Sequence, residues 1–151
     1  KKGESYCKTS NIRKEENRLR KLDKRLKNIR QDSIIRVAVS ITGRKPMFVV
    51  MEDLDVKGML SNKRLARHIQ GLSFKAARNW MEWMCKKEDI PFILADRWFA
   101  SSKICHKCGH VKKDLTLKDR VYKCDKCGYK SDRDLNAVLN LRQYGLEHLC
   151  V

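Results

Sequence analysis

The sequence contains no long apolar run. Its longest, from Met47 to Met51, is far shorter than the roughly 20 residues that a membrane-spanning helix requires. The first ten residues, KKGESYCKTS, place no hydrophobic segment behind their lysines, so no secretory signal is expected there. These absences predict a soluble, cytoplasmic protein with no membrane partner.

Acidic residues are scarce relative to basic ones. The chain has 18 Asp and Glu against 35 Lys and Arg, which gives a formal net charge of +17. This excess points to a polyanionic partner, with nucleic acid as the first candidate. A basic surface that merely faces water is the alternative. A chain of 151 residues has room for one main domain and a small satellite, but hardly for two full domains.

Proline and glycine are both absent from Lys8 to about Ile41, which predicts one long basic helix. Its apolar residues recur at near-helical spacing, namely Leu19, Leu22, Leu26, Ile29, Val37 and Ile41. Two roles for this helix remain open. The apolar stripe packs on the core while the cations face water, or the cations contact phosphates directly.

After a break at residues 42–46, the pattern predicts a strand, a helix and a second strand. MFVVMEDL (47–54) is apolar on both faces, as in a buried strand. Residues 57–72 suggest a loop with short helical pieces, 73–88 a helix, and PFILAD (91–96) the second strand. This order is a βαβ unit with parallel strands and a right-handed crossover. The predicted class is therefore α/β.

A final helix is predicted from Asp134 to about Leu149. Asn136 and Asn140 recur on it at i and i+4, a spacing that suits hydrogen bonds to a neighbouring element. The three tryptophans, Trp80, Trp83 and Trp98, are expected to pack in the core, with stacking on bases as the alternative.

Seven cysteines, an odd number, argue against a disulfide framework and for a reducing compartment. Cys7, Cys85 and Cys150 are scattered. The other four form C-x2-C-x15-C-x2-C, the spacing of a closed zinc ribbon with Cys105, Cys108, Cys124 and Cys127 as ligands of a structural Zn2+. A redox dithiol, or a site in which His106 or His110 replaces a cysteine, is less favoured.

Two carboxylates occupy positions that face clefts in α/β proteins. Glu52 lies where an apolar strand ends, and Asp134 lies in the first turn of the final helix. Sites in open sheets form at the carboxyl ends of strands, and converging carboxylates there hold Mg2+ for phosphodiester cleavage. The alternative is a surface role for Glu52 and a helix-capping role for Asp132 and Asp134.

Several motifs in order carry a family resemblance: the basic helix, then MEDLDVKGM, SSKICHKCGH and YKCDKCGYKSDRDLNAVLNL. From about Lys8 to Leu141 the chain resembles the C-terminal half of the TnpB/OrfB insertion-sequence family, which is related to the compact type V CRISPR effectors. The resemblance implies a RuvC-like, RNase H-like nuclease with an inserted zinc ribbon. The expected parts are a partial nuclease domain with the long helix (1–100), the ribbon (101–131) and the final helix (132–151).

The resemblance also implies Mg2+-dependent, RNA-guided cleavage of DNA, with DNA and guide RNA as partners. Glu52 matches the family's second acidic motif and Asp134 the third, while Asp132 is expected to be structural. Cations of the ribbon are expected to meet phosphates, namely Lys107, Lys112, Lys113, Lys118, Arg120, Lys123, Lys126 and Lys130.

One part of the family pattern is missing. No strand with the first acidic motif precedes Glu52, and the guide- and target-binding lobe is absent. Two carboxylates are too few to hold two Mg2+ ions rigidly, so we expect little cleavage by this chain alone. It is interpreted as a nuclease portion that needs the missing N-terminal half, or as a nuclease-inactive nucleic-acid-binding remnant that regulates transposition or transcription.

Overall fold

The computed structural model describes residues 7–62, 66, 69, 71–116 and 119–149. Lys118, Cys150 and part of the loop expected over 57–72 lie outside these residues. Within the described part of the chain, every helix falls short of the length and apolar character that crossing a membrane requires.

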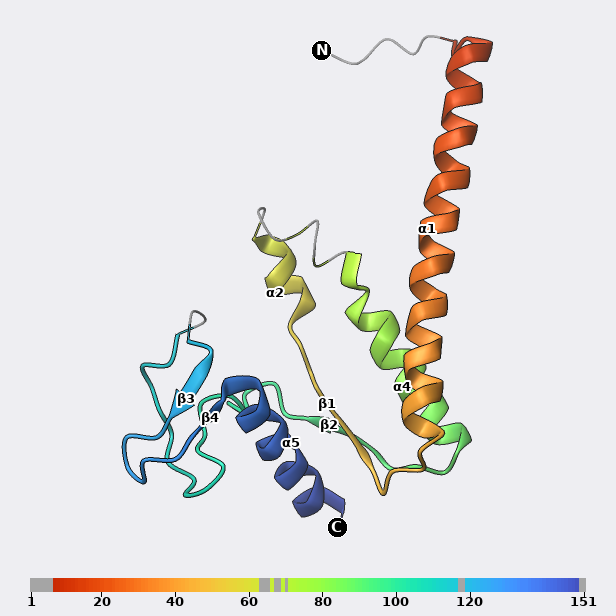
Figure 1. The fold of residues 1–151 in the computed structure, drawn as a ribbon. Helices are drawn as coiled ribbons and strands as arrows, with labels where there is room; N and C mark the ends of the chain where they lie inside the picture. Colours follow the sequence, from red (N-terminus) through yellow and green to blue (C-terminus); the bar gives the residue numbers. More distant parts are fainter. Residues whose placement is uncertain (1–6, 63–65, 67–68, 70, 117–118, 150–151) are drawn as a thin grey trace.

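The long helix is present as α1, Ser10–Thr42. Thr9 caps its first turn, because the Thr9 hydroxyl accepts a hydrogen bond from the Ile12 backbone amide at 3.4 Å. The N-terminal half of α1 extends past the other elements (Figure 1). The sequence prediction for this helix is confirmed.

The apolar stripe of α1 does not pack on the core. Leu19, Leu22, Leu26 and Ile29 are between 49% and 60% exposed. The buried residues of this helix are Ala38 and Thr42, near its C-terminal end. The core-packing alternative is therefore wrong for most of the stripe, because α4, Phe74–Lys87, lies only beside the C-terminal part of α1 (Figure 1).

The predicted βαβ unit is confirmed. Strand β1, Val49–Glu52, pairs in parallel with β2, Phe92–Ala95, and Glu52 lies opposite Ala95 in the register. Between them the chain forms α2, Val56–Ser61, and then α4. The first three residues of β1 are half-buried rather than fully buried, because this sheet has only two strands among the described residues.

The core lies where α1, α4 and the sheet meet. Ala38 of α1 packs with Met81, Met84 and Cys85 of α4 and with Ile90. Val49, Met51 and Phe92 of the strands cover this cluster. Burial of these side chains holds the βαβ unit on the C-terminal end of the long helix.

The final helix, α5, runs over Arg133–Leu149 and lies against the sheet. Gly145 is buried, and a Cβ atom placed there would meet the Phe48 ring and the Val50 side chain. Glycine therefore allows the close approach of α5 to β1. A small second sheet pairs β3, Val121–Lys123, with β4, Lys130–Asp132, in antiparallel order.

Two tryptophans are not core residues. Trp98 is 86% exposed and Trp83 is 52% exposed. Trp98 follows β2 in a turn where its backbone amide donates to the Asp96 carboxylate at 2.7 Å. The expectation of core packing is wrong for these two side chains: Trp83 makes an edge contact with Trp80 and meets the Lys87 ammonium at the surface of α4, and Trp98 lies in an exposed turn.

We predict that Gly145→Ala lowers the free energy of unfolding by about 1–2 kcal/mol. Overpacking costs about 1–3 kcal/mol, and the better helix propensity of alanine recovers up to about 1 kcal/mol. The clash is with Val50 Cγ2, 2.5 Å from the added Cβ, and with the Phe48 ring. Urea unfolding followed by circular dichroism measures the difference. Arg142→Ala, at an exposed position of the same helix, is the control, and a Gly145→Ala variant as stable as wild type would contradict the packing.

Candidate functional site

The four cysteines of the predicted ribbon come together. The sulfurs of Cys105, Cys108, Cys124 and Cys127 all lie within 4.8 Å of one another. Cys105 and Cys127 Sγ are 3.7 Å apart, and Cys108 and Cys124 Sγ are 3.6 Å apart. Tetrahedral zinc with bonds of about 2.3 Å places its sulfurs about 3.8 Å apart. The cluster thus fits a metal ion such as zinc.

Each C-x-x-C pair ends in a tight turn. The Gly109 amide donates to the Cys105 carbonyl at 2.8 Å, and the Gly128 amide donates to the Cys124 carbonyl at 3.1 Å. Both glycines have positive φ, 70° and 69°, which residues with a Cβ rarely adopt. The glycines thus let each pair turn back and present two sulfurs to one point.

The electrostatic environment differs between the sulfurs. The Cys127 amide donates to Cys124 Sγ at 3.5 Å, and it is the main cause that lowers the pKa of Cys124 to about 6. Burial raises the pKa of Cys105. Four neighbouring thiols cannot all ionise unaided, whereas a bound divalent cation favours the thiolate at each position.

The ribbon has only a small apolar core beside the four cysteines. Tyr122 is fully buried against Cys105 and Cys124, with Leu115 and Tyr129 beside them. Lys112 and Asp125 join the two halves of the ribbon by an ion pair of 2.8 Å, which holds the pKa of Asp125 below its ordinary value. Lys112 thus has a structural role within the ribbon, and its expected contact with phosphate stays a prediction.

Two buried asparagines join the ribbon to α5. Asn136 accepts a hydrogen bond from the His106 amide at 3.1 Å and donates to the Ile104 carbonyl at 2.7 Å. Asn140 donates to the carbonyls of Ser101 and Ile104, each at 2.7 Å. The prediction of hydrogen bonds between elements is confirmed, and these bonds set the position of α5 relative to the metal cluster.

Asp132 is the N-cap of α5. Its carboxylate accepts hydrogen bonds from the backbone amides of Asp134 at 2.8 Å and Leu135 at 3.1 Å. The expected structural role of Asp132 is confirmed. Asp134 follows in the first turn with its side chain 75% exposed, and its nearest cation is Arg133 at 3.5 Å. Its carboxylate thus faces solvent at the N-terminal end of α5.

Glu52 lies at the carboxyl end of β1, as predicted, and is exposed. The Ser101 hydroxyl donates to Glu52 Oε1 at 2.6 Å. Because the Ser101 carbonyl also accepts from Asn140, a continuous chain of hydrogen bonds runs from Glu52 to α5. This contact was not predicted from the sequence, since no pattern relates a serine ahead of the ribbon to a strand end 49 residues earlier.

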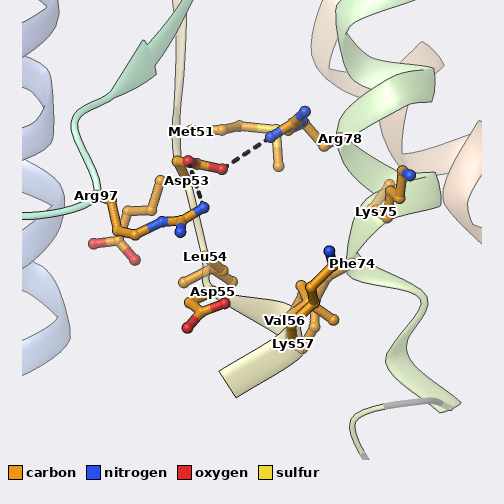
Figure 2. A pocket seen from close by; sticks show the side chains of 12 residues that line it. Met51, Asp53, Leu54, Asp55, Val56, Lys57, Phe74, Lys75, Arg78 and Arg97 are labelled. Atoms are coloured by element: carbon orange, nitrogen blue, oxygen red, sulfur yellow. Dashed lines mark hydrogen bonds and ion pairs between the residues drawn. The ribbon is translucent and has the colours of Figure 1, made fainter. Parts of the chain in front are cut away.

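Asp53, directly after Glu52, holds two arginines. Its carboxylate pairs with Arg78 of α4 at 2.9 Å and with Arg97 after β2 at 3.0 Å. Figure 2 shows the two guanidinium groups reaching Asp53 from opposite sides. The sequence analysis missed this cluster, although the acid pair ED at the end of an apolar strand was a usable signal. These two ion pairs hold the segments that follow β1 and β2 in position beside α4.

The two predicted catalytic carboxylates therefore lie on different elements, Glu52 on β1 and Asp134 on α5. Within the described residues, the cysteine cluster is the only group of three or more His, Cys, Asp or Glu side chains close enough to share an ion. A shared Mg2+ site for Glu52 and Asp134 thus remains a prediction that needs a further ligand.

Residues 74–141 match the family model described as "Cas12f1-like, TNB domain". A protein of Streptomyces pristinaespiralis named "Putative RNA-guided DNA endonuclease" is 34% identical over 138 residues, which cover 91% of this chain and 34% of that protein. "TnpB-like protein L79" of Acanthamoeba polyphaga mimivirus is 29% identical over 135 residues, which cover 85% of this chain and 25% of that protein.

Among solved structures, a chain in the cryo-EM structure of the Cas12f1-sgRNA-target DNA complex is similar, with a TM-score of 0.62 and 26% identity. The match covers 80% of this chain and 35% of that one. The present chain thus spans about a third or less of the length of these relatives.

We predict that the chain binds one zinc ion and that Cys108→Ser abolishes stable binding, because three thiolates leave the tetrahedral shell incomplete. Affinity is expected to fall as the pH falls, since protonation of the thiols competes with the metal. Native mass spectrometry and a colorimetric zinc-release assay measure both effects. Cys7→Ser, at an exposed cysteine outside the cluster, is the control. Equal zinc content in wild type and Cys108→Ser would show that the cluster does not bind zinc in this way.

We predict that Asn136→Ala lowers the free energy of unfolding by about 1–3 kcal/mol, because the part-buried bonds that the Asn136 side chain makes to the His106 amide and the Ile104 carbonyl are lost. Gln143→Ala removes an exposed amide on the same helix, which donates to the Glu147 carboxylate at 3.0 Å. This control is expected to change stability by less than about 0.5 kcal/mol. Chemical unfolding of the zinc-loaded proteins compares the two, and similar values for both variants would argue against a linking role for Asn136.

Proposed function

Because the chain belongs to the TnpB family, which is related to the compact type V effector Cas12f1, we propose that it is the nuclease portion of an RNA-guided DNA endonuclease. We keep the division predicted from the sequence as part of the proposal: a partial RuvC-like domain over 1–100, a zinc ribbon over 101–131 and the final helix over 132–151. The observation that carries the proposal is the pair of hydrogen bonds through Ser101 that joins Glu52, at the end of β1, to α5, the helix that carries Asp134.

The helical geometry of α5 supports the convergence of Glu52 and Asp134. Asp134, Val138, Leu141 and Gly145 are spaced at i, i+4, i+7 and i+11, so they share one face of the helix. Gly145 at the far end of this face packs on β1. Val138 and Asp134 are exposed, so the N-terminal part of this face is open to solvent, and we propose that Asp134 reaches from there toward the end of β1 at which Glu52 lies.

An estimate of length agrees with this arrangement. The bonds from Asn140 to Ser101 and from Ser101 to Glu52 link Glu52 to the part of α5 around Asn140. Asp134 lies six residues earlier, about 9 Å along the helix axis at 1.5 Å per residue. Two Mg2+ ions about 4 Å apart, each with oxygen ligands at about 2.1 Å, span about 8 Å. Two carboxylates at such a separation suit opposite ends of one two-metal site.

In the proposed reaction, bound Mg2+ would stabilise the charge on the attacking and leaving oxygens of a DNA phosphodiester. The residues of this chain supply the placement. Glu52 and Asp134 offer oxygen ligands, Ser101 orients the Glu52 carboxylate, and Asp132 fixes the first turn that carries Asp134. A third carboxylate has to come from outside these 151 residues, so little cleavage is proposed for the chain alone.

DNA and guide RNA are the proposed partners. The net charge of +17 provides a nonspecific attraction for phosphates. The solved structure of the Cas12f1 complex, whose name includes an sgRNA and a target DNA, supports the same two classes of partner. Exposed cations of the ribbon, such as Lys107 and Lys126, are proposed to position the backbone without reading its sequence.

A chimera tests this proposal. The chain replaces the matching third of the Streptomyces pristinaespiralis relative, and cleavage of guide-matched DNA is measured with Mg2+. Glu52→Gln and Asp134→Asn are each expected to lower the cleavage rate by about a hundredfold or more, because a metal ligand is worth several kcal/mol in the transition state. Binding of guide and target is expected to persist.

Asp132→Asn is the matched control, because asparagine caps helices about as well as aspartate and this acid serves as a cap. It is expected to keep most of the activity. Undiminished cutting by Glu52→Gln or Asp134→Asn would refute the carboxylate assignment.

The second candidate function is nucleic-acid binding without catalysis, as in a remnant that regulates transposition or transcription. The observation in its favour is the charge of +17 in a chain that has only two of the expected site carboxylates. It predicts salt-dependent binding to DNA or RNA, and a chimera that binds its target but makes no Mg2+-dependent cut.

A further inference from the structure

A pocket of about 420 Å³ lies beside Glu52, between the segment that follows β1 and the first turns of α4. Figure 2 shows part of its wall, with Asp53 and Leu54 on one side and Lys75 and Arg78 of α4 on the other. This volume is within the range of about 300–1,000 Å³ that is typical of small-molecule sites. Glu52 lines the pocket, and the proposed reaction assigns no role to the apolar and basic residues of its wall.

Four cations and three carboxylates line the pocket, which gives its wall a net charge of +1. Asp53 pairs with both Arg78 and Arg97 through the two ion pairs already described. Asp55 is engaged as the N-cap of α2, where it accepts from the Gly58 amide at 3.1 Å. In contrast, the described residues provide no hydrogen bond or ion pair to Lys57 or Lys75, and both are exposed at the rim. The rim therefore favours an anion.

The remaining lining is apolar and includes one aromatic ring. Phe74, half-buried at the start of α4, faces the aliphatic side chains of Leu54 and Val56, with Met51 and Ala77 nearby. An apolar floor with an aromatic ring suits a flat, weakly polar group, whereas the lysines suit the charge attached to it. A nucleotide combines these two parts in one ligand.

We propose that this pocket binds one unstacked nucleotide of a single strand, with the base against Phe74 and a phosphate near Lys57 and Lys75. Base stacking on aromatic rings and cations along the backbone are the usual means of holding single strands. The proposal rests on the proposed function, because it places the nucleotide next to the scissile phosphate at Glu52. Capture of that nucleotide would keep the strand extended across the two carboxylates.

The test measures binding of single-stranded 12-mers to the 151-residue chain, loaded with zinc and without added Mg2+. One abasic site is moved along a fluorescein-labelled strand. In wild type we expect an abasic site at one position to weaken binding about fivefold or more, since stacking on an aromatic side chain is lost. Phe74→Ala is expected to weaken binding of the intact strand by a similar factor and to remove the effect of that abasic site.

Phe74→Leu removes the ring but keeps an apolar side chain, so this variant should fold even if Phe74→Ala does not. In Phe74→Leu too, the abasic site is expected to have no effect on binding. Trp83→Ala is the matched control, because it removes an exposed aromatic ring from the same helix outside the pocket. Lys75→Gln is expected to weaken intact and abasic strands equally. An abasic effect that is absent in wild type, or unchanged in Phe74→Leu, overturns the proposal.

Parallel DNA and RNA strands identify the source of the nucleotide. A larger abasic effect in DNA assigns the pocket to a DNA strand, and a larger effect in RNA assigns it to the guide. Because the assay contains no Mg2+ and detects no cleavage, its failure is distinct from failure of the nuclease proposal, which Glu52→Gln tests in the chimera.

Discussion

The hydrogen bonds of Asn136 and Asn140 are the constraint on which the remaining arrangement depends. Both side chains are buried, and both bind backbone groups of the segment that leads into the ribbon. A buried amide without partners is costly, so α5 has one favourable position against this segment. That position sets where Asp134 lies, and through Ser101 it is coupled to the carboxylate of Glu52.

The cysteine cluster also fixes the position of the segment that the two asparagines bind, because Cys105 belongs to that segment. The ribbon has Tyr122 as its one large fully buried side chain among the described residues, so cross-linking by a bound ion would supply much of its folding energy. Ile104, whose carbonyl accepts from both asparagines, and His106, whose amide donates to Asn136, flank Cys105 directly. A metal ion that fixes the cysteines would therefore also fix the backbone groups that hold α5, the helix that carries Asp134. This explains why a structural metal and a proposed catalytic carboxylate are so close in the chain.

Much of the local structure was predictable from short-range patterns. The absence of Pro and Gly gave α1, the apolar runs gave β1 and β2, and the helical spacing between them gave α4. The solvent exposure of the apolar stripe of α1 and of Trp98 was not predictable. Apolar residues are buried only where another element covers them, and for Leu19, Leu26 and Trp98 no described element does so.

By itself the sequence determined the cysteine spacing, the α/β order and the two acids at element ends, because each depends on residues close together in the chain. Only the tertiary structure decided that Asp53 holds Arg78 and Arg97, that Lys112 serves the ribbon, and that a pocket opens beside Glu52. These features join residues far apart along the chain. No local sequence pattern predicts such contacts, because they depend on how α4, β2 and the ribbon pack around the end of β1.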